Sequence, residues 1–183
     1  MRVPAVRTTI TRIAAGLVLA AAGLVPVLTI GAPVAGAVTT IQVTTNANAG
    51  AGSLRQALID GNSGGVAAAS DISIVIQDGL APITLASGLV YDGGTGGTHT
   101  LDIVGNDVVI TGNDSFRLLD SSTSGAVSIG GVTMSHGSTT GGGGALFTTS
   151  NTTLTDSTFS NNHSGQWGGA VVSFPSGGAM MVT

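Results

Sequence analysis

The chain has 183 residues, enough for one domain, with no cysteine, five arginines and nine aspartates. The lack of cysteine excludes a disulfide framework and a thiolate metal site. Three arginines lie within the first twelve residues, and the remainder carries a formal charge of about −7, which argues against nucleic-acid binding. The absence of lysine and glutamate, beside abundant threonine, valine and glycine, disfavours a helical protein.

The N-terminal segment has the three parts of a secretory signal peptide. Met1–Arg12 is basic, Ile13–Ile30 is almost wholly apolar, and Ala35–Ala37 offers small residues at a cleavage site. An uncleaved anchor is the alternative, since the apolar stretch approaches the roughly 20 residues that span a bilayer. Two prolines and the small-residue ending favour cleavage after Ala37. The sequence therefore predicts a signal peptide over residues 1–37, an exported protein, and membrane contact through this segment only.

Residues 38–66 are predicted to form a strand and a capping helix. Thr40–Thr44 alternates apolar and polar side chains, as a half-buried strand does. Ser53 and Gln56 can form a capping box at the start of a helix, and Gly61 can end it in the left-handed conformation. A short amphipathic helix before many strands is expected to cover the open end of a sheet stack.

Residues 67–183 are predicted to form parallel β-helix coils, because short apolar runs alternate with Gly/Asn/Asp turns. Strands of three to five residues are too short for an ordinary sandwich. They suit a right-handed parallel β-helix, a solenoid in which each coil carries about three short strands. The expected strands are Ile72–Ile76, Ile83–Leu85, Leu101–Val104, Val108–Thr111, Phe116–Leu119, Ala126–Ile129 and Val132–Met134.

A repeat of 25 residues supports the solenoid. The shift lays Ser128–Ser135 over Thr153–Ser160, and Gly143–Leu146 over Gly168–Val171. A fixed period of this length is typical of stacked repeats. A disordered low-complexity linker is the alternative, and the regular apolar spacing argues against it.

Within one coil, Gly143–Asn162, the alternation predicts which side chains face the interior. Ala145 and Phe147 are expected to point inward from the first strand, Leu154 from the second and Phe159 from the third. Ala170 and Val172 would stack on Ala145 and Phe147 in the next layer.

The repeat residues resemble those of secreted right-handed parallel β-helix proteins. Gly143–Leu146 and Gly168–Val171 match the Gly-Gly-Ala-aliphatic element of the polymorphic outer-membrane protein repeats, and Phe159–Asn162 matches their Phe-x-x-Asn element. Gly52–Leu58 is similar to the Ser-Leu-Arg-Glu-Ala segment that opens many bacterial surface β-helix proteins, with Gln56 in place of the usual glutamate. The resemblance implies an exported, adhesin-like protein at the cell surface.

Parallel β-helices also include polysaccharide lyases and hydrolases, so the acidic residues were weighed as catalysts. A glycosidase needs two carboxylates about 5–10 Å apart, and a lyase needs a cationic base or charge-stabilising group. Asp107 and Asp114 each follow Gly-Asn, which indicates turn chemistry, and Arg117 is interpreted as a surface residue. The other candidate acids are Asp102, Asp120 and Asp156.

Neither a metal site nor a cofactor site is predicted, and no catalytic residue is assigned. His99, His136 and His163 share no short ligand spacing, although His136 and His163 lie 27 residues apart, close to one coil. Trp167 could stack on a sugar or pack over the edge of a coil, and the edge is favoured.

The sequence thus predicts a secreted or cell-surface β-helix that interacts with a glycan or a protein without catalysis. The alternative is a carbohydrate-active β-helix enzyme or a fragment of one. The final residues, Gly177–Thr183, begin a strand and stop, and Val182-Thr183 matches Leu154-Thr155. An incomplete last coil is therefore expected, with edge-to-edge self-association.

Overall fold

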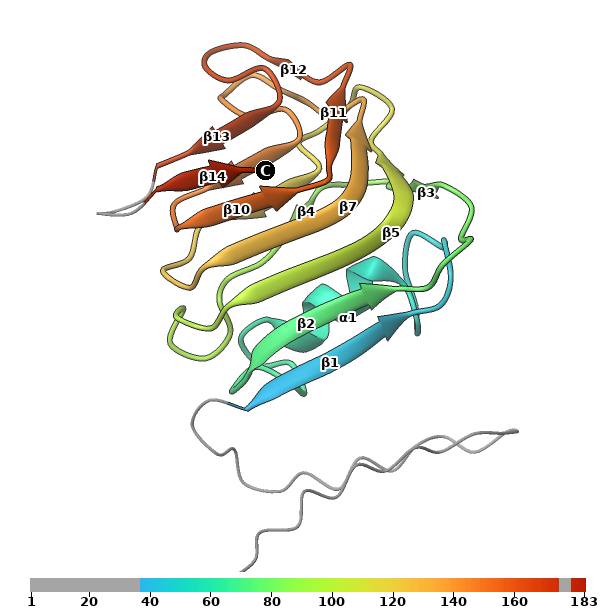
Figure 1. Cartoon of the computed structure of the whole chain (residues 1–183), viewed down its shortest axis with the longest axis vertical. Helices are drawn as coiled ribbons and strands as arrows, with labels where there is room; N and C mark the ends of the chain where they lie inside the picture. The colour runs from blue at the N-terminus through green and yellow to red at the C-terminus, as the bar shows by residue number, and fades with distance from the viewer. Residues whose placement is uncertain (1–36, 175–178) are drawn as a thin grey trace, which may run out of the picture. The chain divides into compact units, whose positions relative to one another are not determined.

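Parallel strands wind into a solenoid in the computed structural model, which describes residues 37–174 and 179–183 (Figure 1). Every strand pairing among these residues is parallel. The strands stack for about four turns around one interior, forming a right-handed parallel β-helix with one short helix. The predicted fold class is confirmed. Residues 1–36 of the expected signal peptide lie outside the described residues.

Three sheets form the walls of the solenoid. The main sheet has the order β1-β2-β5-β7-β10-β14, with β3 beside β5 and β11 beside β7. Its strands are β1 (Val38–Val43), β2 (Asp71–Ile76), β3 (Ile83–Thr84), β5 (Leu101–Thr111), β7 (Val127–Ser135), β10 (Thr152–Thr155), β11 (Thr158–Ser160) and β14 (Met180–Val182). The second sheet has the order β13-β9-β6-β4, with strands β4 (Leu89–Val90), β6 (Leu119–Ser121), β9 (Leu146–Thr148) and β13 (Val171–Ser173). A third sheet pairs β8 (Ser138–Thr139) with β12 (His163–Ser164).

The 25-residue repeat is the physical stacking register of two adjacent coils. Leu154 pairs with Ile129, and Phe159 with Met134, across the main sheet. Val171 pairs with Leu146 across the second sheet. Each pair lies 25 residues apart, so the sequence shift and the strand register agree in both sheets.

Strands β5 and β7 are each continuous, where the sequence predicted two strands and a turn. Asn106 and Asp107 have φ of 47° and 63°, and the pairing with β7 shifts register between Val104 and Val108. These residues bend the strand without reversing it, because β7 bends beside them at Gly131, where φ is 63°. The local turn residues were recognised, but their effect is a corner within one long strand.

Helix α1 (Leu54–Gly61) contacts β1, β2 and β4 and fills the interior at the N-terminal end of the solenoid. The Ser53 side chain accepts a hydrogen bond from the Gln56 backbone at 3.1 Å, as predicted. The Gln56 side chain instead donates to Asp60 at 2.8 Å, so only half of the capping box forms. Gly61 is the last helical residue and not a left-handed cap, because a Cβ there would collide with Ile72.

The repeat motifs have clear structural roles at the corners. Gly143 and Gly168 occupy equivalent places and have φ of 69° and 54°, where a side chain would be strained. Asn162, the asparagine of Phe-x-x-Asn, donates to the Met134 carbonyl at 2.9 Å and accepts from the Gly137 backbone at 2.8 Å. Its amide therefore fastens one coil to the corner of the preceding coil.

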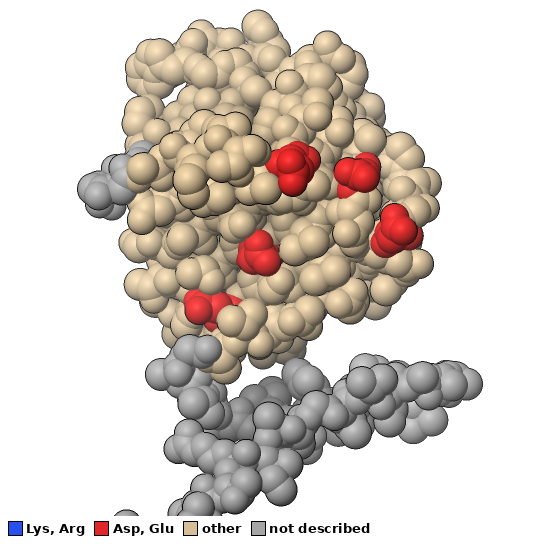
Figure 2. Space-filling model, viewed as in Figure 1, with Lys and Arg blue, Asp and Glu red and all other residues tan. Residues whose placement is uncertain are grey.

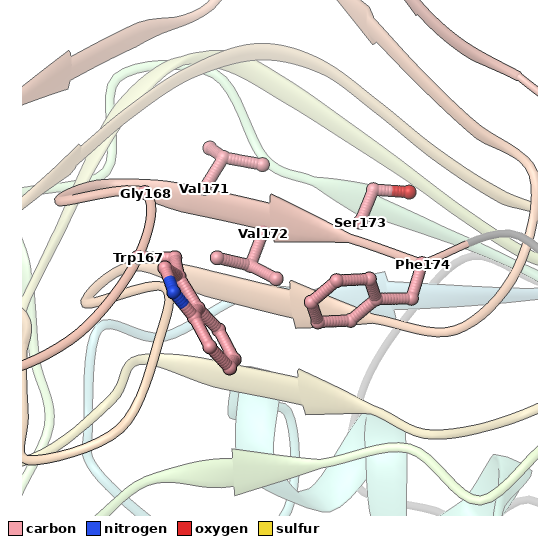
Figure 3. A pocket seen from close by; sticks show the side chains of 6 residues that line it. All are labelled: Trp167, Gly168, Val171, Val172, Ser173 and Phe174. Atoms are coloured by element: carbon pink, nitrogen blue, oxygen red, sulfur yellow. The ribbon is translucent and has the colours of Figure 1, made fainter.

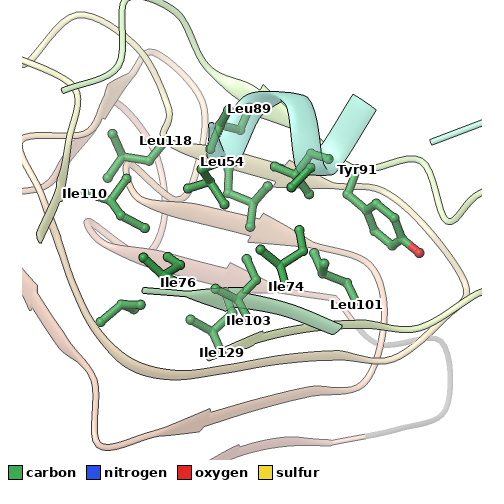
Figure 4. Close-up of a cluster of buried hydrophobic side chains, with 14 of the residues drawn as sticks. Leu54, Ile74, Ile76, Leu89, Tyr91, Leu101, Ile103, Ile110, Leu118 and Ile129 are labelled. Atoms are coloured by element: carbon green, nitrogen blue, oxygen red, sulfur yellow. The ribbon is translucent and has the colours of Figure 1, made fainter. Parts of the chain in front are cut away.

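The interior is a stack of aliphatic side chains (Figure 4). One inward column crosses the whole main sheet and consists of Ile41, Ile74, Ile103, Ile129, Leu154 and Val182. Leu54 of α1 and Leu89 of β4 pack in the same cluster. At about 1.5–3 kcal/mol for each large buried side chain, stacking of this column supplies stability that a lone coil lacks.

Two strand predictions need correction. In β9 the buried side chains are Leu146 and Thr148, and Phe147 is only half-buried on the outer face. The Gly-Gly-Ala corner extends through Ala145, so the alternation begins one residue later than predicted. The strand expected at Phe116–Leu119 lies at Leu119–Ser121, because a serine occupies the second inward position and hides the alternation.

Candidate functional site

The outer face of the second sheet carries an unusual column of side chains. Because Leu119 and Ser121 point inward, Asp120 points outward, and the register aligns it with Val90 of β4 and Phe147 of β9. Val172 of β13 follows Phe147 in the same column. This face is therefore built from large apolar groups around one acid.

Three aromatic rings gather at the C-terminal end of this column. The Phe147 and Phe174 ring centres lie 6.0 Å apart, and the Phe174 and Trp167 ring centres lie 6.1 Å apart at an interplanar angle of 90°. Trp167 is 65% exposed and Phe174 is 52% exposed. The whole chain has only six aromatic residues. We call Phe147, Trp167, Val172 and Phe174 the outer aromatic patch.

Arg117 and Asp120 form the polar border of the outer aromatic patch. The guanidinium of Arg117 forms an ion pair with Asp120 and lies 4.6 Å from the centre of the Phe147 ring. It also donates to the carbonyl oxygens of Gly142 at 2.9 Å and Gly143 at 3.1 Å. Arg117 lies at the surface as predicted, but all of its hydrogen-bonding nitrogens are engaged by the protein.

A shallow groove of about 440 Å³ lies between Trp167 and Phe174 along β13 (Figure 3). Val171, Val172 and Ser173 form its base. The turn that presents the indole is ordered, because the Trp167 carbonyl accepts from the Gly143 backbone at 3.1 Å and from the Ser164 hydroxyl at 3.0 Å. The groove thus offers two aromatic faces on a fixed backbone.

The candidate acids are not assembled into a catalytic pair by the stacking of the coils. The column neighbours of Asp102 are Ser73 and Ser128, and those of Asp120 are Val90 and Phe147. Asp107 and Asp114 lie at opposite ends of the second half of β5 and both have positive φ, as the turn interpretation predicted. Figure 2 shows one face of the molecule, on which acidic side chains stand apart from one another.

The histidines also lie apart. His163 pairs with Ser138, whereas His136 faces Asn161, so the near-coil spacing of His136 and His163 does not bring their rings together. The Nδ1 atom of His136 lies 3.2 Å from Asp114, and that of His99 lies 3.6 Å from Asp71. Within residues 37–174 and 179–183, no group of three potential ligands could hold a metal ion.

Sequence reasoning identified Trp167 but missed Phe147 and Phe174 as its partners. Phe147 was placed inside because the alternation was counted from Ala145. Phe174 follows β13 directly and shows no local pattern. Their alignment could have been found from the 25-residue shift, which places Phe147 beside Val172, between Trp167 and Phe174.

Comparisons with known proteins give this chain no family. No protein-family model, curated protein or solved structure matches it. Among the described residues, no helix is long and apolar enough to cross a bilayer. The arguments for its function therefore rest on the chain itself.

Proposed function

We propose that this chain is an exported protein of the cell surface or extracellular space that binds a glycan or a protein and performs no catalysis. The observation that carries the proposal is the outer aromatic patch, with Trp167 and Phe174 exposed on a rigid β-helix wall. Large exposed apolar groups that serve no core mark interaction sites. The basic, apolar and small-residue parts of residues 1–37 support export.

We further infer kinship with the polymorphic outer-membrane protein repeats and with the surface proteins that open with Ser-Leu-Arg-Glu-Ala. The support is that the shared residues have structural work here: Gly143 and Gly168 turn the corners, Asn162 links coils, and Ser53 caps α1. This kinship favours an adhesin-like role in bacteria over an enzymatic one.

Export and catalysis can be tested on one preparation, the protein recovered from the medium or cell surface after expression of the full-length chain. N-terminal sequencing should begin at Val38, and a first residue of Met1 would contradict export through cleavage. Incubation with neutral glycans and polyuronates should show no turnover. Turnover that disappears in Asp107→Asn or Asp114→Asn would replace this proposal with a carbohydrate-active enzyme.

A further inference from the structure

The side chains that form the groove are not required by the interior. The core cluster contains neither Trp167 nor Phe174, and both rings are more than half exposed. Half of the six aromatic residues of the chain lie in the outer aromatic patch. We propose that the groove between Trp167 and Phe174 binds a neutral sugar ring, an inference that rests on the proposed interaction function and gives it a ligand class.

The shape of the groove suits a flat ring with one apolar face. The perpendicular arrangement of the Trp167 and Phe174 rings gives a floor and a wall (Figure 3). Aromatic side chains combine an apolar face with low conformational entropy, and the indole N–H adds a hydrogen-bond donor. The Ser173 hydroxyl lines the base of the groove and supplies a further polar atom. A pyranose has the matching properties, with C–H groups on one face and hydroxyls at its rim.

The charges favour a neutral sugar over an anionic one. The part of the chain after residue 37 contains nine aspartates and only two arginines. Arg117 is engaged by Asp120 and two carbonyl oxygens. Arg55 is likewise engaged, by the carbonyl oxygens of Asn48 and Gly88. Neither guanidinium is free to pair with a uronate or sulfate, and the surrounding carboxylates repel such groups.

The size of the groove favours a small ring over a protein partner. Its volume of about 440 Å³ lies within the range of roughly 300–1,000 Å³ for small-ligand sites. A stable protein interface buries roughly 800 Å² on each partner and centres on a flat or interlocking surface. Two rings beside a single strand provide a subsite for a sugar unit, not a surface of that extent.

Trp167 is the only tryptophan in the chain, so its fluorescence reports directly on the groove. The exported protein is titrated with gluco- and manno-oligosaccharides as neutral probes and with oligogalacturonate as the anionic probe. We expect a saturable change in tryptophan emission with a neutral probe and none with oligogalacturonate. Calorimetry on the same samples gives the affinity without depending on the indole.

Four variants separate stacking from folding. Trp167→Ala and Phe174→Ala should each weaken neutral-sugar binding at least about tenfold, whereas Trp167→Phe retains a flat ring and should lose less. Val90→Ala is the matched control, because Val90 is 58% exposed and faces outward on the same sheet three strands away. It should bind as the unaltered chain does. Circular dichroism checks that each variant is folded.

Several results would overturn the inference. Binding of oligogalacturonate alone, or equal affinity in folded Trp167→Ala, would place the ligand elsewhere or give it the opposite charge. Exported protein that adheres to cells stripped of glycans through Trp167 would assign the groove to a protein partner and leave the proposed function standing. Folded protein that is exported but binds neither cells nor glycans would overturn the proposed function as well.

Discussion

The guanidinium carbon of Arg117 lies 4.6 Å from the centre of the Phe147 ring, although the two residues belong to successive coils. The same guanidinium reaches the Gly142 and Gly143 carbonyls in the corner that precedes β9. One side chain therefore joins a strand to the corner of the next coil and supports the inner end of the outer aromatic patch. Its arrangement depends on a planar fork of donors, which lysine lacks.

We expect Arg117→Met to lower the free energy of unfolding by about 2 kcal/mol, because it breaks charge-assisted hydrogen bonds and leaves Asp120 without its partner. Arg117→Lys keeps the charge but not the fork, and should recover less than half of the loss. Urea denaturation measures both changes. A loss no larger than that of an ordinary surface substitution, or full rescue by lysine, would contradict this role.

The sequence predicted the solenoid because its evidence is periodic. The 25-residue shift is set by strand register, so Leu154 over Ile129 can be recognised without coordinates. The outer aromatic patch could not be predicted in the same way. Whether Phe147 faces in or out depends on where the Gly-Gly-Ala corner ends, and that is decided by contacts with neighbouring coils. A shift of one residue in a strand exchanges its two faces.

The long bent strands illustrate the same limit. Gly105, Asn106 and Asp107 are turn-forming residues, and local chemistry alone predicts a chain reversal there. The structure keeps the strand running because β7 bends in register beside it at Gly130 and Gly131. Local propensity gave the position of the irregularity, whereas the partner strand decided its form.

Gly144 and Gly169 occupy the same motif position in successive coils but have different surroundings. A Cβ on Gly144 would lie under 3.0 Å from the carbonyl oxygens of Gly137, His163 and Gly169. A Cβ on Gly169 would have its nearest neighbour, the Asn162 carbonyl oxygen, at 3.6 Å. We expect Gly144→Ala to cost about 3 kcal/mol of unfolding free energy through overpacking. Gly169→Ala, the matched control, should change it by less than about 0.5 kcal/mol. Equal losses in thermal or urea unfolding would contradict the packing argument.

The inward column of the main sheet ends at Val182, which stacks on Leu154 but is 67% exposed. Met180 and Met181 beside it are also exposed, on a strand paired with β10. An exposed apolar edge strand invites pairing with another copy. We therefore predict that the exported chain self-associates in sedimentation experiments, and that Val182→Lys makes it more monomeric. Val66→Lys, at a residue 63% exposed outside the strands, is the control.

Hydrogen exchange gives a second check on this edge. Amides of β14 should exchange much faster than those of β7 and β10 in the interior of the main sheet, because edge pairing opens at lower free energy. A sharp monomer in sedimentation, with β14 as protected as β7, would show that the edge is not available for pairing.

Tyr91 should make the stability of the protein fall in alkaline solution. Its side chain is fully buried, and its hydroxyl contacts the carbonyl oxygens of His99 at 3.1 Å and Thr100 at 3.2 Å. Burial, followed by the negative charges of Asp71 and Asp92, raises the pKa of Tyr91 above its ordinary value. The folded protein therefore retains the phenolic proton at a pH where the unfolded chain loses it. This contribution to stability is complete below about pH 10, and it is lost above that value at about 1.4 kcal/mol per pH unit until the pKa of the folded state is reached.

The chain offers a clean test of this alkaline effect, because Tyr91 is its only tyrosine and it has no lysine or cysteine. Urea denaturation at a series of pH values, with tyrosinate absorbance as a second signal, should show the decline in the unaltered protein. Tyr91→Phe should be less stable near neutral pH by about 1 kcal/mol, since two buried carbonyl groups lose a donor. Its stability should then stay level where that of the unaltered protein falls. The same alkaline slope in Tyr91→Phe would assign the effect to another group.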